Sequence, residues 1–179
     1  MPDSFLTRFR TIHAIDIDHL APVLFRALHG RALRRAGTSL HWSQTDFLSD
    51  PPKVLASIKK PAVLFCNIMG QLRFQLRDEA LVEAEVLRVK ALLAGYDWAS
   101  FHELLSGDQP PSRSPYAPQA LGGRPEGVDI LAHYGLGGVW LDHLTGALLP
   151  ETSARMILPW RFGPRRLHLV EAGFVAREA

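Results

Sequence analysis

The sequence contains a single cysteine, Cys66, and no run of about 18 apolar residues. One cysteine excludes an internal disulfide, and a chain without disulfides is typical of a reducing compartment. Because Cys66 lies in the most apolar stretch of the chain, we expect a buried and unreactive thiol. No membrane-spanning helix is predicted, and the N-terminal residues lack the long uncharged segment of a signal peptide. A cytoplasmic protein is therefore expected.

The chain also lacks a charge excess and the common catalytic motifs. Its formal net charge is +2 over 179 residues, so electrostatics do not favour a nucleic acid or a membrane as partner. The eight histidines form no HxxxH or HExxH pair and there is no CxxC, so no metal site is expected. GxSxG and Walker loops are absent too, which excludes the commonest hydrolase and NTPase signatures.

The most informative stretch that is present is Pro61–Leu72. Its apolar run Ala62–Phe65 predicts a short strand buried on both faces, in the centre of a parallel sheet. Asn67 follows the carboxyl end of this strand, and Gly70 stands where the backbone must turn. Ligands bind just beyond the carboxyl ends of strands in open α/β sheets. This turn is therefore a candidate ligand site, and a core strand with an ordinary turn is the alternative.

Periodicity and turn residues predict alternating strands and helices along the chain. Strands are expected at Thr11–Ile17, Ser39–Phe47 and Trp98–Leu105, and helices at His19–Ala36, Pro52–Lys60 and Asp78–Ala94. Further expectations are a long surface loop at Gly107–Gly127, a helix broken at its glycines at Val128–Leu149, and an antiparallel hairpin of Arg155–Phe162 and Arg166–Val175. The predicted fold class is α/β, a doubly wound, mainly parallel sheet with this hairpin antiparallel at its edge, in a single domain over residues 1–179.

Polar residues follow three of the predicted strands at their carboxyl ends. Asp16 and Asp18 end the first strand, the pair Asp46-Phe47 ends the second, and Asn67 follows the next. In a doubly wound sheet these ends lie along one rim. A carboxylate accepts hydrogen bonds from the vicinal hydroxyls of a ribose, and an acid–aromatic pair suits an adenine. The pattern indicates a cofactor that contains a nucleoside.

This order of elements resembles the class I S-adenosylmethionine-dependent methyltransferases, from the second strand of that family to its C-terminal hairpin. The resemblance implies that Asp16 or Asp18 binds the cofactor ribose and that Asp46, with Phe47 beside it, contacts the adenine. It implies that the loop after the family's fourth strand borders the methionine moiety and the substrate. In this chain that loop supplies Asn67 and Gly70 on the cofactor side and Met69 and Gln71 on the substrate side. The implied activity is methyl transfer to a small-molecule or protein acceptor.

The sequence departs from the family at its start. The family's first strand carries a glycine-rich turn and lies centrally, whereas about ten residues, none of them glycine, precede Thr11 here. Three explanations are open: an N-terminally shortened version of a longer protein, direct pairing of the second and fourth strands, or another chain in the gap. An unpaired sheet edge at this place would favour a homo-oligomer. A non-catalytic remnant that serves as a binding or assembly partner is the alternative to an enzyme.

His102 is the candidate general base, because it lies near the end of the Trp98–Leu105 strand on the same predicted rim. A structural histidine is the alternative. Asp142 and His143 are adjacent in sequence and would not face each other on a helix, so no catalytic pair is expected there. His168 and Glu171 lie on the predicted hairpin, where alternation places them on opposite faces.

Overall fold

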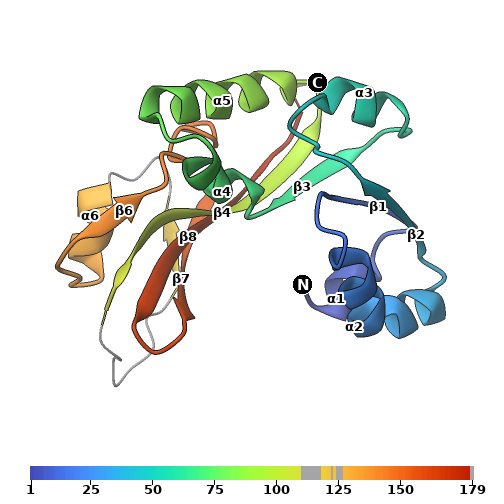
Figure 1. Ribbon diagram of the computed structural model, residues 1–179, viewed down its shortest axis with the longest axis horizontal. Coiled ribbons are helices and arrows are strands. Elements are labelled where there is room, and N and C mark those ends of the chain that lie inside the picture. Colours follow the sequence, from blue (N-terminus) through green and yellow to red (C-terminus); the bar gives the residue numbers. More distant parts are fainter. Residues whose placement is uncertain (110–117, 122, 124–126, 178–179) are drawn as a thin grey trace. The chain divides into compact units, whose positions relative to one another are not determined.

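The structure is a computed structural model that describes residues 1–109, 118–121, 123 and 127–177. Most of the predicted surface loop Gly107–Gly127 lies outside the described residues. The chain divides into two compact units, Met1–Lys59 and Lys60–Ala179 (Figure 1). The single domain expected from the sequence stays a prediction. No helix in the described part of the chain is long and apolar enough to cross a membrane.

The first unit is built on two parallel strands. Its elements are α1 (Asp3–Leu6), β1 (Thr11–Asp16), α2 (Ala21–Ala36), β2 (Ser39–Gln44) and α3 (Pro51–Ala56). Parallel strands need a crossover connection, and α2 supplies it between β1 and β2. Proline stands in the first turn of α2, and Gly37 ends the helix in a left-handed conformation with φ 70°. The predicted strand–helix–strand order is therefore present in this unit.

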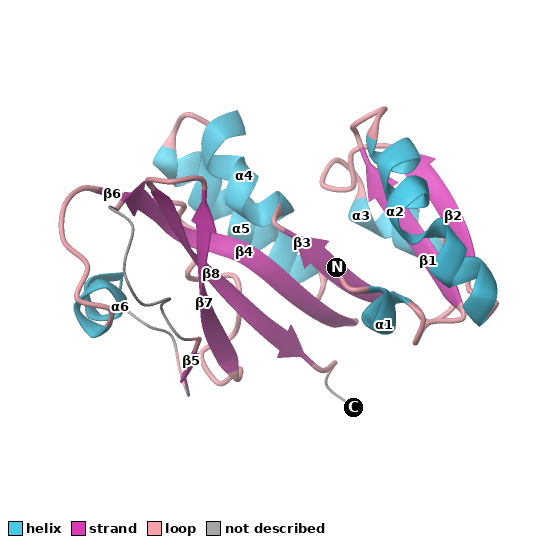
Figure 2. Ribbon diagram, turned by 90° about the horizontal axis from the view of Figure 1, so that it is seen from below, coloured by secondary structure: helices cyan, strands magenta, loops and turns pink. Residues whose placement is uncertain are grey.

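The second unit holds a sheet of six strands with helices packed on it (Figure 2). Its elements are β3 (Ala62–Cys66), α4 (Ile68–Gln75), α5 (Glu79–Leu92), β4 (Asp97–Asp108), β5 (Gln119–Leu121), α6 (Gly127–His133), β6 (Trp140–Asp142), β7 (Arg155–Phe162) and β8 (Arg166–Val175). The strand order is β3-β4-β8-β7-β5, and β6 pairs with β4. β4, with twelve residues, is the longest of these strands and has partners along both of its sides.

The predicted doubly wound, mainly parallel sheet is wrong. Among the described strands of the second unit, only β3 and β4 pair in parallel, and the other pairings are antiparallel. β1 and β2 form a separate sheet. β3 was expected in the centre, yet it lies at the end of the strand order and its burial alternates, with Leu64 exposed. A short apolar run does not distinguish a strand buried on both faces from an edge strand that is covered on one face.

Individual elements agree better with the sequence than their arrangement does. α5 forms where an amphipathic helix was predicted, and its valines Val82, Val86 and Val89 are completely buried. β7 and β8 have the predicted bounds, but the hairpin lies inside the sheet because β5 pairs with β7 and β4 with β8. The predicted broken helix over Val128–Leu149 is wrong beyond His133. The chain turns at Gly135 and Gly138, which have positive φ, and then forms β6.

The two faces of the larger sheet differ in character. One face buries an apolar cluster that includes Leu105, Ile157 and Leu169, with Ile130 of α6 packed on it. Residues directly opposite each other in an antiparallel pair share a face. Glu103 pairs with Val170 and Ser106 with His168, across a bulge between Glu103 and Leu105. The second face therefore carries Glu103, Ser106 and His168, and Glu171 lies on the other face from His168, as predicted.

Candidate functional site

The turn after β3 is shaped by Asn67 and Gly70. Asn67 adopts a left-handed conformation with φ 61°, which asparagine tolerates better than most residues, and it precedes α4. Gly70 lies so close to β4 that a Cβ atom there would stand 2.7 Å from Asn67 Oδ1 and 3.0 Å from Glu103 Cβ. The absence of a side chain at Gly70 allows α4 to contact β4. The Asn-x-x-Gly spacing noted in the sequence therefore has a packing role.

Glu103 of β4 is the centre of a buried polar group that we name the Glu103 cluster. Its members are Asn67, Glu103, Ser106, His143 and His168. Asn67 Nδ2 donates to Glu103 Oε1 at 3.0 Å, and the backbone N–H of Glu103 donates to Asn67 Oδ1 at 3.1 Å. Glu103 is buried, and a buried carboxylate requires such partners to offset its lost hydration. These two bonds connect the turn after β3 to β4.

His143, which follows β6, is completely buried in this cluster. Its Nδ1 lies 2.8 Å from the carbonyl oxygen of Gly70; since a carbonyl only accepts, Nδ1 carries the hydrogen. Its Nε2 lies 3.0 Å from Ser106 Oγ and 3.2 Å from Glu103 Oε2. Burial lowers the pKa of His143 below its usual 6.5, although the bond to Gly70 and the charge of Glu103 act to raise it.

The neutral form of His143 completes a directional chain of hydrogen bonds. Arg166 Nη2 donates to Ser106 Oγ at 2.9 Å. The Ser106 hydroxyl can then donate to Nε2 of neutral His143, and Nδ1–H donates to Gly70. A proton that arrives at His143 would occupy Nε2, next to the Glu103 carboxylate. The cluster therefore contains a proton acceptor with a negative charge beside it.

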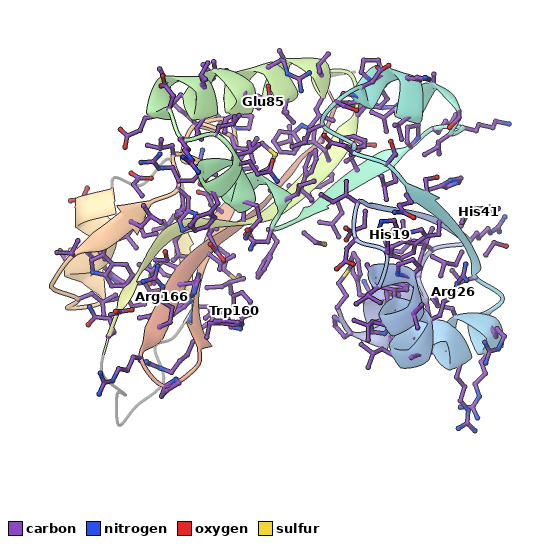
Figure 3. All side chains as sticks on the ribbon, in the orientation of Figure 1. His19, Arg26, His41, Glu85, Trp160 and Arg166 are labelled. Carbon is purple, nitrogen blue, oxygen red and sulfur yellow. The ribbon has the colours of Figure 1, made fainter. Side chains whose placement is uncertain are left out.

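His168 approaches the same carboxylate from β8. Its Nδ1 is 3.0 Å from Glu103 Oε1, within ion-pair distance, but neither ring nitrogen makes a hydrogen bond to any described residue. The rings of Trp160 and Phe162 lie 5.7 Å and 5.9 Å from the His168 ring, centroid to centroid. Both aromatic side chains are exposed. Trp160 is labelled in Figure 3. Exposed aromatic rings thus cover a histidine whose nitrogens are buried.

The predicted base His102 lies on the opposite face of β4 and is completely buried. Its Nε2 is 3.0 Å from Glu171 Oε2, and Arg155 Nη1 donates to Glu171 Oε1 at 2.8 Å. Arg155 Nη2 donates to two backbone carbonyls of the segment before β7. These contacts join the hairpin to β4, which favours the alternative of a structural histidine.

The predicted acids of the first unit lie at one end of its strand pair. Asp16 is opposite Gln44, and Asp46 follows two residues later. One oxygen of each acid accepts a nearby backbone N–H, at 2.8 Å for Asp16, 2.8 Å for Asp18 and 2.9 Å for Asp46. The second carboxylate oxygen makes no hydrogen bond to a described residue. These oxygens can accept hydrogen bonds from the hydroxyl groups of a ribose. Phe47, which was expected beside the adenine, is buried.

The remaining predicted site residues lie in the second unit, in or before α4. Met69 has no exposed surface, and Gln71 is exposed. Asn67 and Gly70 contact each other and Glu103, as described above. The predicted burial of Cys66 is wrong: the residue is exposed, and partial burial of its thiol raises its pKa. The structure therefore groups the predicted residues as acids in one unit and the α4 turn in the other.

Sequence reasoning missed Glu103, His143 and His168 as members of one site. His143 was set aside on the assumption of a helix, but it follows the short strand β6, where Asp142 is exposed and His143 is buried. Strand alternation could have shown that His102 and Glu103 lie on different faces of the sheet, because neighbours on a strand point to opposite faces. No sequence signal links Glu103 to His168, which is far away in the chain.

A cavity of about 300 Å³ is lined by residues of α5, α6, the end of β4 and the segment around β6, and by no member of the Glu103 cluster. Its lining includes Leu105 and Ile130, which belong to the apolar face of the sheet, and the acids Glu83 and Asp142. None of the predicted site residues lines it. The cavity therefore does not extend the candidate site.

Comparisons of the chain with protein-family models, with curated proteins and with solved structures found no match. Within the described ranges, no group of three or more histidine, cysteine, aspartate or glutamate side chains could hold a metal ion. The chemistry that the described side chains offer is of two kinds: carboxylates at the end of β1 and β2 that accept hydrogen bonds, and the acid–base groups of the Glu103 cluster.

Proposed function

We propose that the chain binds S-adenosylmethionine and transfers a methyl group to a small-molecule or protein acceptor. The observation that supports this most directly is the register of β1 and β2, which brings Asp16 and Asp46 to the same end of a parallel pair. Each acid keeps one oxygen without a hydrogen bond to a described residue, and a nucleoside offers hydroxyl and amine donors to such oxygens. The bound cofactor supplies an electrophilic methyl group on a sulfonium.

The turn after β3 would offer a methyl acceptor a rigid surface on the second unit. Two hydrogen bonds hold the side-chain amide of Asn67 on Glu103, and His143 holds the carbonyl of Gly70. A turn fixed in this way loses little freedom when a ligand binds, and methyl transfer depends mainly on proximity and alignment. Gln71 is exposed beside it and is the residue of this turn that an acceptor can reach.

The acceptor must lose a proton when it is a hydroxyl or a protonated amine, and the Glu103 cluster offers groups that can take it. The neutral ring of His143 accepts at Nε2, and Glu103 Oε2, 3.2 Å away, would stabilise the resulting charge. His102 and His143 are both completely buried, so neither can meet an acceptor directly. This proposal assigns the proton-accepting role to His143 because the Glu103 carboxylate lies beside its Nε2, and the proton would reach the ring through intervening groups.

Asp16→Asn tests the ribose assignment with the least disturbance. An asparagine keeps a side-chain oxygen for the N–H of Asp18, so the turn is retained while the charge is lost. We expect the Kd for S-adenosylhomocysteine to rise at least tenfold, measured by calorimetric titration. Asp97→Asn is the matched control. Asp97 is the first residue of β4, so it lies at the amino end of a strand and not at a carboxyl end. Equal affinity of Asp16→Asn and the wild type would refute the assignment.

A non-catalytic binding or assembly partner is the second candidate function. The described part of the chain pairs β1 and β3 on one side only, and β3 contains no charged residue that would protect its edge. Leu64→Lys places a charge on β3. A folded chain that binds no cofactor, and whose self-association is lost with Leu64→Lys, would support this second function. For either function we propose a cytoplasmic location, from the single cysteine.

A further inference from the structure

One side of α2 carries an apolar row that no described residue of the first unit covers. The row, which we name the α2 stripe, consists of Leu20, Val23, Leu24 and Leu28. These side chains are between 60% and 73% exposed, and their spacing places them along one side of the helix. The opposite side packs on the unit, with Phe25 against Trp42 and His29 against Asp3. Exposed apolar rows of this kind mark interaction surfaces.

The charges around the α2 stripe are separated along the helix axis. Beyond its C-terminal end the same side continues with Arg31, Arg34 and Arg35, which are exposed. Before its N-terminal end stand Asp16 and Asp18, and the helix itself contains no acid. The surface is therefore acidic at one end, apolar in the middle and basic at the other end.

We infer that the α2 stripe binds the α2 stripe of a second copy of this chain, with the two helices antiparallel about a twofold axis at Leu24. In that arrangement Leu24 faces Leu24 of the second copy, and Leu20 faces its Leu28. Arg31 then points toward the second copy's turn at Asp18. A surface with this charge order is complementary to itself when it is reversed, which is the requirement of an isologous interface.

The same charge order argues against other occupants. Parallel helices would place arginines on arginines and acids on acids, which costs free energy. An anionic membrane would attract the arginines but repel Asp16 and Asp18. Four aliphatic side chains from each copy form a small apolar centre, below the size of a standard stable interface. The expected complex is a reversible dimer with a Kd in the micromolar range.

This inference does not depend on the proposed function, and it differs from association through a sheet edge. The sheet-edge hypothesis places the contact between two copies on β1 or β3. The α2 stripe places it on the surface of a helix instead. Leu24 lies on the axis, so one substitution there affects the contact twice. Leu87 of α5 is also exposed, at 53%, and is a matched control outside the α2 stripe.

Sedimentation velocity over a concentration series, up to about 100 µM, measures the dimer. We expect Leu24→Asp to raise the Kd at least 100-fold and Leu87→Asp to leave it within about twofold. Arg31→Glu should weaken the dimer, and Asp18→Arg combined with Arg31→Glu should restore it. A wild-type chain that stays monomeric, or a dimer that persists in Leu24→Asp, would overturn the inference.

Oxidative cross-linking tests the antiparallel register itself. All variants carry Cys66→Ser, because Cys66 is exposed and would form its own cross-links. Leu24→Cys should form a disulfide-linked dimer by itself, since facing Cα atoms at a close helix contact meet the distance for a disulfide. Leu28→Cys alone should stay uncrosslinked, and an equal mixture of Leu20→Cys and Leu28→Cys should give the mixed dimer. Efficient cross-linking of Leu28→Cys alone, or none of Leu24→Cys, would refute the arrangement.

Discussion

Substitution of Gly70 by alanine tests how tightly α4 contacts β4. The new Cβ would stand 2.7 Å from Asn67 Oδ1 and 3.0 Å from both Cβ and N of Glu103, well inside ordinary contact distance. Overpacking of this kind costs about 2 kcal/mol. Displacing the Asn67 amide from the buried Glu103 carboxylate adds about 1–2 kcal/mol. The better helix propensity of alanine returns about 1 kcal/mol, so the free energy of unfolding should fall by about 2–3 kcal/mol.

Urea unfolding, followed by the fluorescence of tryptophans including the buried Trp98, measures this difference. Gly95→Ala is the control, because a Cβ there meets no atom within 4 Å and the φ of Gly95 is not left-handed. The control should be unchanged or more stable by about 0.4–1 kcal/mol. A Gly70→Ala variant as stable as the control would refute the close contact between α4 and β4.

Three further perturbations test other parts of the structure. The unfolded state binds more protons at His143 than the folded state does, because burial lowers the folded pKa below 6.5. Wild-type stability should therefore fall as pH drops from about 6.5 toward that lower pKa, and His143→Gln should remove this pH dependence. Parallel stability profiles of the wild type and the variant would contradict the prediction. Arg155→Met leaves Glu171 buried without its ion pair and should cost about 3–5 kcal/mol by urea unfolding. Arg166→Met loses an ion pair with the exposed Asp108 and a hydrogen bond to the Ser106 hydroxyl, and should cost about 1–2 kcal/mol; losses equal to those of Arg155→Met would be inconsistent with these roles. Cys66 should react with a thiol reagent in the folded protein, more slowly than a free thiol because its pKa is raised; reaction only after unfolding would show that it is buried.

Local patterns predicted most elements of this fold, but not their arrangement. The α5 helix and the β7–β8 hairpin were predicted because their residues repeat with helical or strand periodicity next to clear turn signals. Strand order depends instead on contacts between distant segments, so β3 was placed in the centre although it lies at an edge. Helical spacing in α2 indicated a helix but not which side is covered, and most of its leucines are exposed.

The candidate site shows the same division between local and distant information. The turn at Asn67 and Gly70 was predicted because a strand, a polar residue and a glycine follow one another in sequence. The Glu103 cluster could not be predicted, because β4, the residue after β6, and β8 each contribute one of its titratable groups. His143 became a candidate only when β6 replaced the predicted helix.

Calorimetric titration of the purified, folded chain with S-adenosylmethionine and S-adenosylhomocysteine tests the proposed function most directly. We expect both to bind with a Kd in the micromolar range, which corresponds to about −8 kcal/mol. The carboxylates at the end of β1 and β2 would then hold the nucleoside, and Asp16→Asn would weaken both ligands alike. No heat of binding from a chain shown to be folded by circular dichroism would contradict the methyltransferase proposal.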